Sequence, residues 1–207
     1  MESIYGKNKD YLSFSAVRLW LSNKDGYRKH YYEGAAGIDT VYTRFGKTIA
    51  ETLESRDFTK YPELAKIPFY SVSEHPLEAY FDGVKVIAYL DLFEPETFSI
   101  GEVKTGVKSA WDKVKVRQWD QLPWYSLMVK ETYGKVDPRV HLIWLQTEFK
   151  EQKGMLQNSE LQLTGKMQIF PRHIVEYERK RIREQIINAA KEIKDDYATY
   201  RRTTSSI

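Results

Sequence analysis

Three charged residues lie close together in a segment that otherwise has the pattern of two buried strands. Asp91 closes the apolar run VKVIAYLD, a turn at residues 94–97 follows, and Glu102 and Lys104 lie two positions apart in the next run. Successive side chains of a strand point to opposite faces, so Glu102 and Lys104 share a face and Val103 points the other way. Because only a short turn joins the two runs, we expect Asp91 to lie close to Glu102 across the strand pair.

This arrangement suits one kind of chemistry. Two carboxylates at one place repel each other unless a cation lies between them. A hard divalent cation such as Mg²⁺ takes oxygen ligands of this kind, and a lysine beside it can orient a water molecule or stabilise charge that develops on a phosphate. The residues therefore point to metal-assisted hydrolysis of a phosphodiester. The alternative is a surface hairpin with an ordinary Glu–Lys pair, since the pattern is short.

Two further polar residues follow the hairpin, in a helix expected over residues 111–133. Gln121 and Tyr125 are four apart and share a face, and Arg117 extends that stripe if the helix is continuous. Their side chains can hold a lysine or a DNA phosphate by hydrogen bonds. Pro123 is expected to kink this helix. The alternative is that Tyr125 is a core aromatic and Gln121 a solvated neighbour.

An amphipathic helix is expected over residues 41–57, with Ile49 and Leu53 on its apolar face. Glu51 and Glu54 lie on the same helix. Either carboxylate can supply a further ligand to a metal.

Basic residues are enriched over residues 104–117, directly after the charged hairpin. They can follow DNA phosphates, and Trp111, Trp119 and Trp124 can stack on frayed bases. The alternative is a solvated helix face with its tryptophans in the core. A second basic run, in residues 172–183, has interleaved glutamates, which favours a solvated face there. The candidate DNA-binding residues are Lys108, Lys113, Lys115 and Arg117.

Helices and strands follow one another in an order that indicates an α/β fold. A first helix follows Ser13 or Ser15, either of which can cap it, and a long charged helix is expected from Pro171 to about Tyr200. Residues 60–78 contain three prolines and are expected to be mostly irregular. Strands are expected over residues 69–75, over 79–93 as a hairpin that turns at Asp82 and Gly83, and over 98–105, 141–149 and 161–170. The order predicts a central mixed β-sheet flanked by helices.

The composition sets limits on the function. The chain has 207 residues, of which 42% are hydrophobic, so we expect one globular domain spanning residues 1–207. A net charge of +3 is too small to establish a nucleic-acid partner. The absence of cysteine excludes disulfides, thiolate zinc sites, iron–sulfur clusters and cysteine nucleophiles. No signal region or membrane span is expected, and the expected location is cytoplasmic.

Taken in order, the motifs resemble the PD-(D/E)xK nuclease superfamily, specifically its RecB-like and lambda-exonuclease-like branch. LSFSAVRLWLSNKDGYRKHYY resembles the opening Ser-x-Ser helix of that branch, and FGKTIAETLE resembles its first motif helix. FDGVKVIAYLDLFEPETFSIGEVKTG resembles its strand–acid–turn–E-x-K core, and QLPWY its Gln-x-x-x-Tyr motif. The resemblance covers roughly residues 11–150 and implies a restriction-endonuclease-like core.

The resemblance also implies an activity and a set of site residues. The implied activity is a deoxyribonuclease that uses Mg²⁺ or Mn²⁺ and no iron–sulfur cluster, an exonuclease rather than a site-specific endonuclease. Lys104 is the implied catalytic lysine, positioned by Gln121 and Tyr125, which can also contact the DNA backbone. The implied catalytic set is Asp91, Glu102, Lys104, Gln121 and Tyr125. The implied metal ligands are Glu51, Asp91, Glu102 and the backbone carbonyl of Val103.

One position departs from the family pattern. Many RecB-like members carry a histidine in the pattern G-x-x-x-H-E of the first motif helix, and here Ala50 stands at that position before Glu51. Lambda-exonuclease-like members use a glutamate on this helix, which makes Glu51 the first choice and Glu54 the second. The missing histidine leaves open a weak or inactive nuclease-fold protein that binds DNA. A stand-alone phage-type nuclease implies DNA and a single-strand annealing or other recombination protein as partners.

Overall fold

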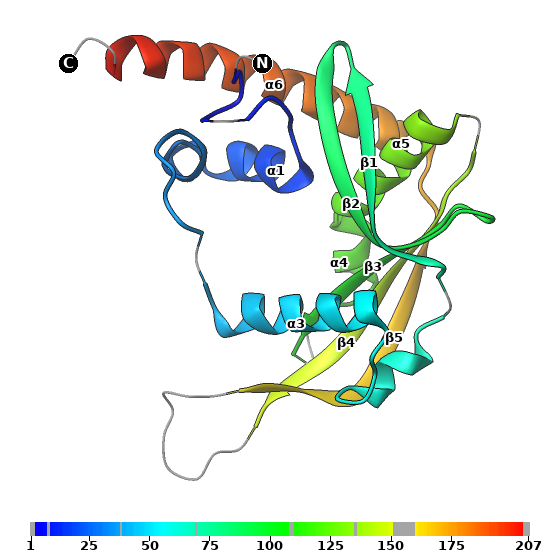
Figure 1. Cartoon of the computed structure of the whole chain (residues 1–207). Helices are drawn as coiled ribbons and strands as arrows, with labels where there is room; N and C mark the ends of the chain where they lie inside the picture. Colours follow the sequence, from blue (N-terminus) through cyan, green and yellow to red (C-terminus); the bar gives the residue numbers. More distant parts are fainter. Residues whose placement is uncertain are drawn as a thin grey trace.

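The computed structural model describes residues 3–7, 9–37, 39–68, 70–107, 110–134, 136–150 and 160–204. Within this part of the chain, five strands form one sheet in the order β1-β2-β3-β4-β5 (Figure 1). The strands are β1 (Val72–Phe81), β2 (Val84–Glu94), β3 (Ser99–Gly106), β4 (Arg139–Phe149) and β5 (Leu161–Arg172). The β3–β4 pair is parallel and the other pairs are antiparallel, so the sheet is mixed.

Helices cover both faces of this sheet. They are α1 (Phe14–Ser22), α2 (Lys24–Tyr27), the π-helical η1 (Arg28–Tyr32), α3 (Val41–Ser55), the 3₁₀-helical η2 (Pro62–Lys66), α4 (Lys113–Gln118), α5 (Gln121–Tyr133) and α6 (Glu176–Thr204). The segment with α4 and α5 makes the crossover that two parallel strands require. The predicted α/β fold with a mixed, helix-flanked sheet is confirmed.

Strand β4 divides the core into two clusters because its side chains alternate between the faces of the sheet. Leu142 and Trp144 pack into a cluster with α1, α5 and α6. Ile143 and Leu145 pack into a second cluster with α3, which contributes Ile49 among others. The continuous apolar run of β4 therefore reflects a central strand that is buried on both sides.

The edge strand β1 differs from the expectation for residues 60–78. One strand runs from Val72 to Phe81 where the sequence suggests an irregular stretch and broken strands. Pro76 lies inside it, opposite Tyr89. Proline is tolerated there because β1 is at the sheet edge, where a strand has a neighbour on only one side. The expected hairpin turn at Asp82 and Gly83 is present, with positive φ at both residues, as a type I′ turn requires.

Strand β1 is distorted at Glu74. Ser73 pairs with Leu92 and His75 pairs with Leu90, so the register is unchanged and Glu74 lies opposite Asp91, although these two residues are not paired in the ladder. The φ of Glu74 is 49°, a left-handed value that is unusual for a residue other than glycine. This local distortion adds no residue to the strand, but it departs from regular strand geometry and so affects where the Glu74 side chain points.

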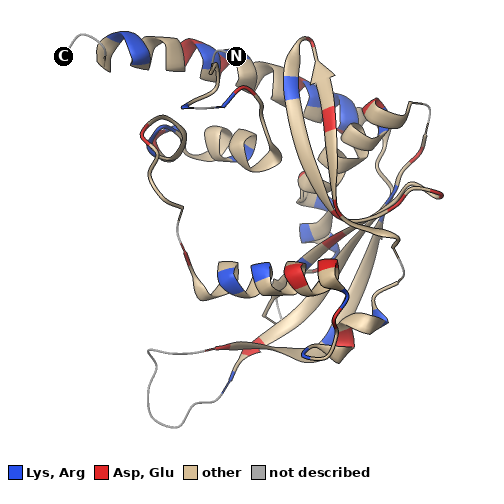
Figure 2. Ribbon diagram, viewed as in Figure 1, with Lys and Arg blue, Asp and Glu red and all other residues tan. Residues whose placement is uncertain are grey.

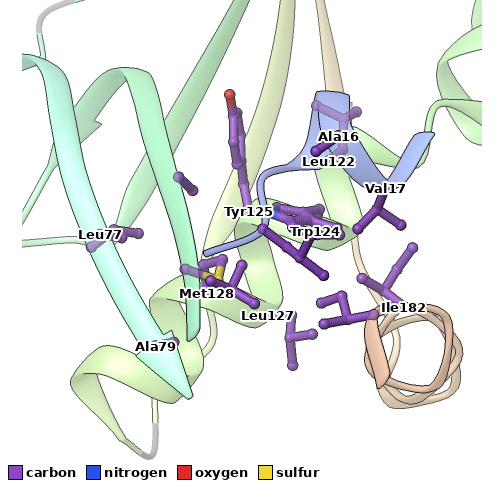
Figure 3. Packing of buried hydrophobic residues seen from close by; sticks show 14 of the residues in the cluster. Ala16, Val17, Leu77, Ala79, Leu122, Trp124, Tyr125, Leu127, Met128 and Ile182 are labelled. Atoms are coloured by element: carbon purple, nitrogen blue, oxygen red, sulfur yellow. The ribbon is translucent and has the colours of Figure 1, made fainter. Parts of the chain in front are cut away.

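The expected kinked helix over residues 111–133 is in fact two helices. Helix α4 ends at Gln118 and α5 begins at Gln121, so Pro123 is the third residue of α5. A proline in the first turn does not interrupt a helix, because the N–H groups there have no acceptor within the helix. The predicted kink at Pro123 is therefore wrong, and Arg117 belongs to α4 and not to the stripe of Gln121. Figure 3 shows how α5 enters the core through side chains such as Trp124.

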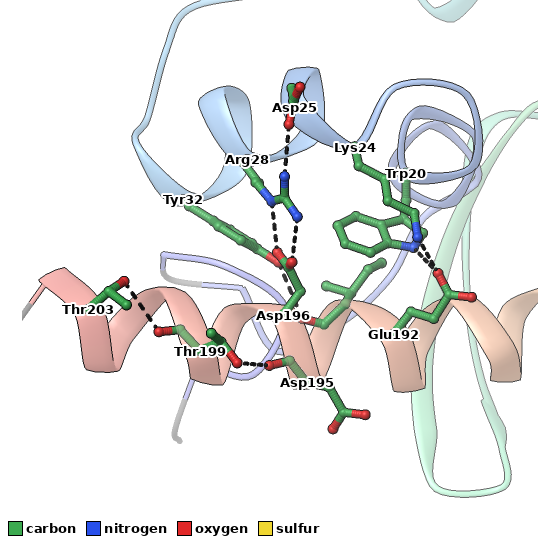
Figure 4. A network of polar contacts seen from close by, with 11 residues as sticks. Trp20, Lys24, Asp25, Arg28, Tyr32, Glu192, Asp195, Asp196, Thr199 and Thr203 are labelled. Atoms are coloured by element: carbon green, nitrogen blue, oxygen red, sulfur yellow. Dashed lines mark hydrogen bonds and ion pairs between the residues drawn. The ribbon is translucent and has the colours of Figure 1, made fainter.

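The N-terminal helices are attached to α6. The Ser13 side chain accepts a hydrogen bond from the backbone N–H of Ala16 and so caps α1, as predicted. Glu192 accepts hydrogen bonds from Trp20 over 3.0 Å and from Lys24 over 2.8 Å. Figure 4 shows these contacts together with the pairing of η1 residues to the next turns of α6. None of the described helices combines the length and apolar composition that a membrane crossing needs.

Candidate active site

The charged hairpin forms where β2 and β3 separate. Their backbone pairing ends at Leu92 and Gly101. Beyond this pair, the Oδ2 atom of Asp91, one residue from Leu92, accepts a hydrogen bond over 2.8 Å from the backbone N–H of Val103, two residues from Gly101. The Asp91 carboxylate thus accepts the N–H that a backbone carbonyl would accept in a regular strand pair. This hydrogen bond fixes Asp91 next to Glu102.

Glu102 is a fully buried carboxylate, with 0% of its surface exposed. Its carboxylate makes an ion pair with the ammonium of Lys104, and neither oxygen accepts a hydrogen bond of normal geometry. Burial, and then the charge of Asp91, raise the pKa of Glu102 to about 8. Burial also raises the pKa of Asp91, against the opposing effect of Lys104. The two acids therefore lie in contact range of one another, as the sequence predicts.

Lys104 remains a cation in this environment. Burial by itself would lower its pKa, but the charges of Glu102 and Asp91 outweigh burial and raise the pKa. Its side chain is 28% exposed, so the ammonium is partly accessible from solvent. A positive charge is thus held between two acids and an open surface.

Gln121 and Tyr125 share a face of α5, as predicted. The Gln121 amide donates a hydrogen bond from Nε2 to the Tyr125 hydroxyl over 2.7 Å. The ring of Tyr125 packs in the core and its hydroxyl points away from the apolar cluster (Figure 3). Burial, and then the charges of Glu102 and Asp91, raise the pKa of Tyr125 well above its ordinary value. The phenol is therefore neutral and offers an O–H donor toward the carboxylates.

A cavity of about 500 Å³ opens between α3 and the separated strands, and we name it the α3 cavity. Asp91, Val103 and Lys104 line it from the sheet, and Ala50 lines it from the helix. Glu74 lines it from strand β1. The arrangement places a small alanine directly opposite the charged residues.

The structure does not bring Glu51 into this cavity. Its side chain is 62% exposed and lies 3.8 Å from the ammonium of Lys47 on the same helix. Figure 2 shows the basic first half and the acidic second half of α3. Besides Asp91, the carboxylate that lines the cavity is Glu74, whose pKa is raised by burial and then by the charges of Asp91 and Glu54. Sequence reasoning missed Glu74 because the residue types do not reveal the pairing of β1 with β2 that places Glu74 opposite Asp91.

The donor set suits a hard divalent cation. Asp91 and Glu102 supply carboxylate oxygens, and those of Glu102 are buried beside the ammonium of Lys104. Among the described residues, no group of three or more His, Asp or Glu side chains is arranged for a metal. Mg²⁺ is held in many sites by one or two carboxylates with water in its remaining positions, so the two acids meet its needs.

The predicted DNA-binding residues lie beyond the hairpin. Lys113, Lys115 and Arg117 are exposed on α4, and Lys115 also donates to the backbone carbonyl of Ala110 over 3.2 Å. Lys108 lies outside the described residues. Among the expected stacking residues, Trp124 is buried in the core, whereas Trp111 and Trp119 are half-buried and contact each other at 5.3 Å between ring centroids.

Comparisons with known proteins bear on the fold. No protein-family model matches the chain, and no curated protein matches it. Among solved structures it is similar to an inferred exonuclease of Eubacterium rectale, with a TM-score of 0.59 and 14% identity over 91% of this chain and 83% of that one. It is also similar to a phage-related exonuclease of Haemophilus somnus 129PT, with a TM-score of 0.54 and 13% identity over 90% and 82%. The chain therefore has a nuclease-like fold.

Proposed function

We propose that the chain is a Mg²⁺-dependent deoxyribonuclease of the PD-(D/E)xK type that degrades DNA from an end. The observation that carries this proposal is the buried pair of Asp91 and Glu102 with Lys104 beside it, of which Asp91 and Lys104 line the α3 cavity. Two acids buried side by side are costly unless a cation neutralises them. The names of the two similar structures, both described as exonucleases, support the end-directed activity.

The proposed roles follow from the positions of the side chains. Asp91, Glu102 and the backbone carbonyl of Val103 would hold the metal, which when bound supplies Lewis-acid polarisation of a phosphate oxygen. Lys104 presents its ammonium to the phosphate, where it stabilises negative charge and orients the attacking water. Tyr125, held by Gln121, keeps its hydroxyl directed at the carboxylates. The other residues that line the α3 cavity limit the directions from which a phosphodiester can approach Lys104.

The test is digestion of matched DNA substrates. Linear duplex, linear single-stranded and closed circular DNA are incubated with Mg²⁺ or with EDTA, and the products are followed over time. We expect loss of both linear forms or one of them with Mg²⁺, and intact circles. Cleavage of circles would replace the exonuclease by an endonuclease, and no cleavage of any substrate would contradict a nuclease.

A second function is favoured by one observation. Ala50 lines the α3 cavity where many RecB-like nucleases carry a histidine. The absence of this histidine is what would be expected of a protein that keeps the nuclease fold and binds DNA without cutting it. It would bind DNA with strong salt dependence and show no turnover with Mg²⁺ or Mn²⁺.

A further inference from the structure

A second and larger cavity lies next to Lys104. It has a volume of about 1,050 Å³ and we name it the α1 cavity, because the first turns of α1 form one of its walls. Lys104, Gln121 and Tyr125 line it from one end, while the β2 segment from Ile87 to Tyr89 lines another wall. Since Lys104 lines both cavities, a strand whose phosphate contacts Lys104 has space on two sides.

The walls of the α1 cavity are aromatic and basic. None of the described residues that line it is Asp or Glu. Three basic side chains line it: Lys9, Arg18 and Lys104. The aromatic residues other than Tyr125 are Tyr11, Phe14, Tyr31, Tyr89 and Trp119. Aromatic faces combined with basic groups are typical of surfaces that bind single-stranded nucleic acid.

Lys9 is a buried cation that lies against two aromatic rings. Only 8% of its surface is exposed, and its ammonium lies 4.1 Å from the ring centroid of Tyr11 and 4.6 Å from that of Tyr31. It makes no ion pair within the described residues. An ammonium that is buried in this way gains from an anion in the adjacent cavity.

Arg18 is the second cation of this wall. Its guanidinium lies 4.4 Å from the ring centroid of Trp119 and it also makes no ion pair within the part of the chain described. An arginine that already stacks on an aromatic ring keeps its N–H groups available for a phosphate. The cavity thus offers two cations to a backbone and several rings to bases.

We propose that the α1 cavity binds single-stranded DNA next to the scissile phosphate, with bases against Tyr89 and its neighbouring rings and phosphates at Lys9 and Arg18. This inference rests on the proposed nuclease function and specifies its substrate. Ring faces on the cavity wall can stack only on bases that have left a duplex, because paired bases cover one another's faces. The strand that reaches Lys104 is therefore single-stranded, whether it comes from a free single strand or from a frayed duplex end.

The experiment uses two tyrosines on the same face of the β1–β2 hairpin. Tyr89 is 55% exposed and lines the α1 cavity, whereas Tyr80 is 56% exposed and does not line it. Binding of a fluorescein-labelled oligonucleotide is measured by anisotropy in EDTA, so that no cleavage occurs. Tyr89→Ala should weaken single-strand binding about 5- to 100-fold, as expected for the loss of one stacking ring, and Tyr80→Ala should change it less than about twofold.

A second pair of variants, each of which removes one positive charge, completes the experiment. Arg18→Gln should lower the slope of log affinity against log salt by about 0.7, the value for one phosphate contact on a single strand. Lys66→Gln, an exposed charge far from this cavity on η2, should leave the slope unchanged. A blunt duplex without frayed ends should bind more weakly than the single strand and respond to neither tyrosine variant.

The outcomes separate this inference from the proposed function. Equal binding of all variants, or an equal loss of single-strand and duplex binding in Tyr89→Ala, would overturn the α1 cavity as a single-strand site, whatever the nuclease assay shows. A specific loss of single-strand binding in Tyr89→Ala supports it. If that loss occurs and the wild-type protein cuts nothing with Mg²⁺, only the nuclease proposal fails.

Discussion

The Oδ2 atom of Asp91 accepts a hydrogen bond from the backbone N–H of Val103 over 2.8 Å, just beyond the last β2–β3 backbone pair of Leu92 and Gly101. The Asp91 carboxylate therefore has two proposed roles, as the acceptor of this hydrogen bond and as a metal ligand. Two substitutions can separate them. Asp91→Asn keeps an acceptor for the N–H and removes the charge, whereas Asp91→Ala removes both. Urea unfolding should show Asp91→Ala destabilised by about 1–3 kcal/mol relative to Asp91→Asn, because a buried N–H loses its acceptor.

The same pair of variants tests metal binding. Titration calorimetry with Mn²⁺ should show loss of binding in both Asp91→Asn and Asp91→Ala, because both lack the charged oxygen. Binding of Mn²⁺ by Asp91→Asn with wild-type affinity would contradict the assignment of Asp91 as a ligand.

Lys104 is predicted to serve the reaction and not the metal. Lys104→Met keeps the length of the side chain and should lower the rate of DNA cleavage at least about 100-fold, as for other preorganised charge donors. Its affinity for Mn²⁺ should be equal to or higher than that of the wild type, because a repelling cation has left the two acids. Lys47→Met removes an exposed charge from the same α3 cavity and should change the cleavage rate by less than about tenfold.

The hydroxyl of Tyr125 is predicted to matter for turnover more than for folding. Tyr125→Phe keeps the buried ring and removes the acceptor of the Gln121 amide. We expect kcat to fall about tenfold, the effect of losing roughly 1.4 kcal/mol, with KM and the free energy of unfolding little changed. A large loss of stability with unchanged kcat would make Tyr125 a core residue only.

The carboxylates of Glu74 and Glu51 give opposite predictions for the α3 cavity. Glu74 lines it and its charge interacts with that of Asp91, whereas Glu51 is exposed and paired with Lys47. Glu74→Gln should therefore weaken Mn²⁺ binding several-fold through lost attraction, and Glu51→Gln should not. The reverse result in calorimetry would return Glu51 to the role that the sequence suggests for it.

Lys9 gives a prediction of pH dependence. Burial lowers its pKa from 10.5 to about 8, with a smaller opposing effect from Asp10. Between these two pH values the unfolded chain binds the proton more tightly, so this residue makes the folded state more stable as the pH rises from 8 to 10. The free energy of unfolding of the wild type minus that of Lys9→Met should rise over this interval in urea titrations. A difference that stays flat or falls would show that Lys9 is not buried as a charge.

The sequence is sufficient for the charged hairpin because its geometry follows from short-range rules. The period of two in a strand places Glu102 and Lys104 on one face, and the short turn returns the chain to Asp91. The spacing of four in a helix likewise predicts that Gln121 and Tyr125 meet. These contacts depend only on the local secondary structure.

The predictions from sequence differ from the structure where the effect of a residue depends on elements that lie far from it in the chain. Pro76 is compatible with a strand only because β1 lies at the sheet edge, which no local pattern reveals. Pro123 is harmless because α5 starts two residues before it. Glu74 lies opposite Asp91 with a left-handed backbone, so strict alternation does not predict that its side chain lines the cavity.

Helix α6 has a consequence for the use of this protein as a tool. It holds α1 through Glu192, which bonds both Trp20 and Lys24, and η1 through Asp196, which bonds Arg28, yet none of its residues lines the α1 cavity. Truncation of the chain before Glu192 would therefore remove the contacts that hold α1, which forms a wall of the α1 cavity. No residue that lines the cavity would be deleted. Labels or fusions are better attached after Thr204 than used to replace the last turns of the helix.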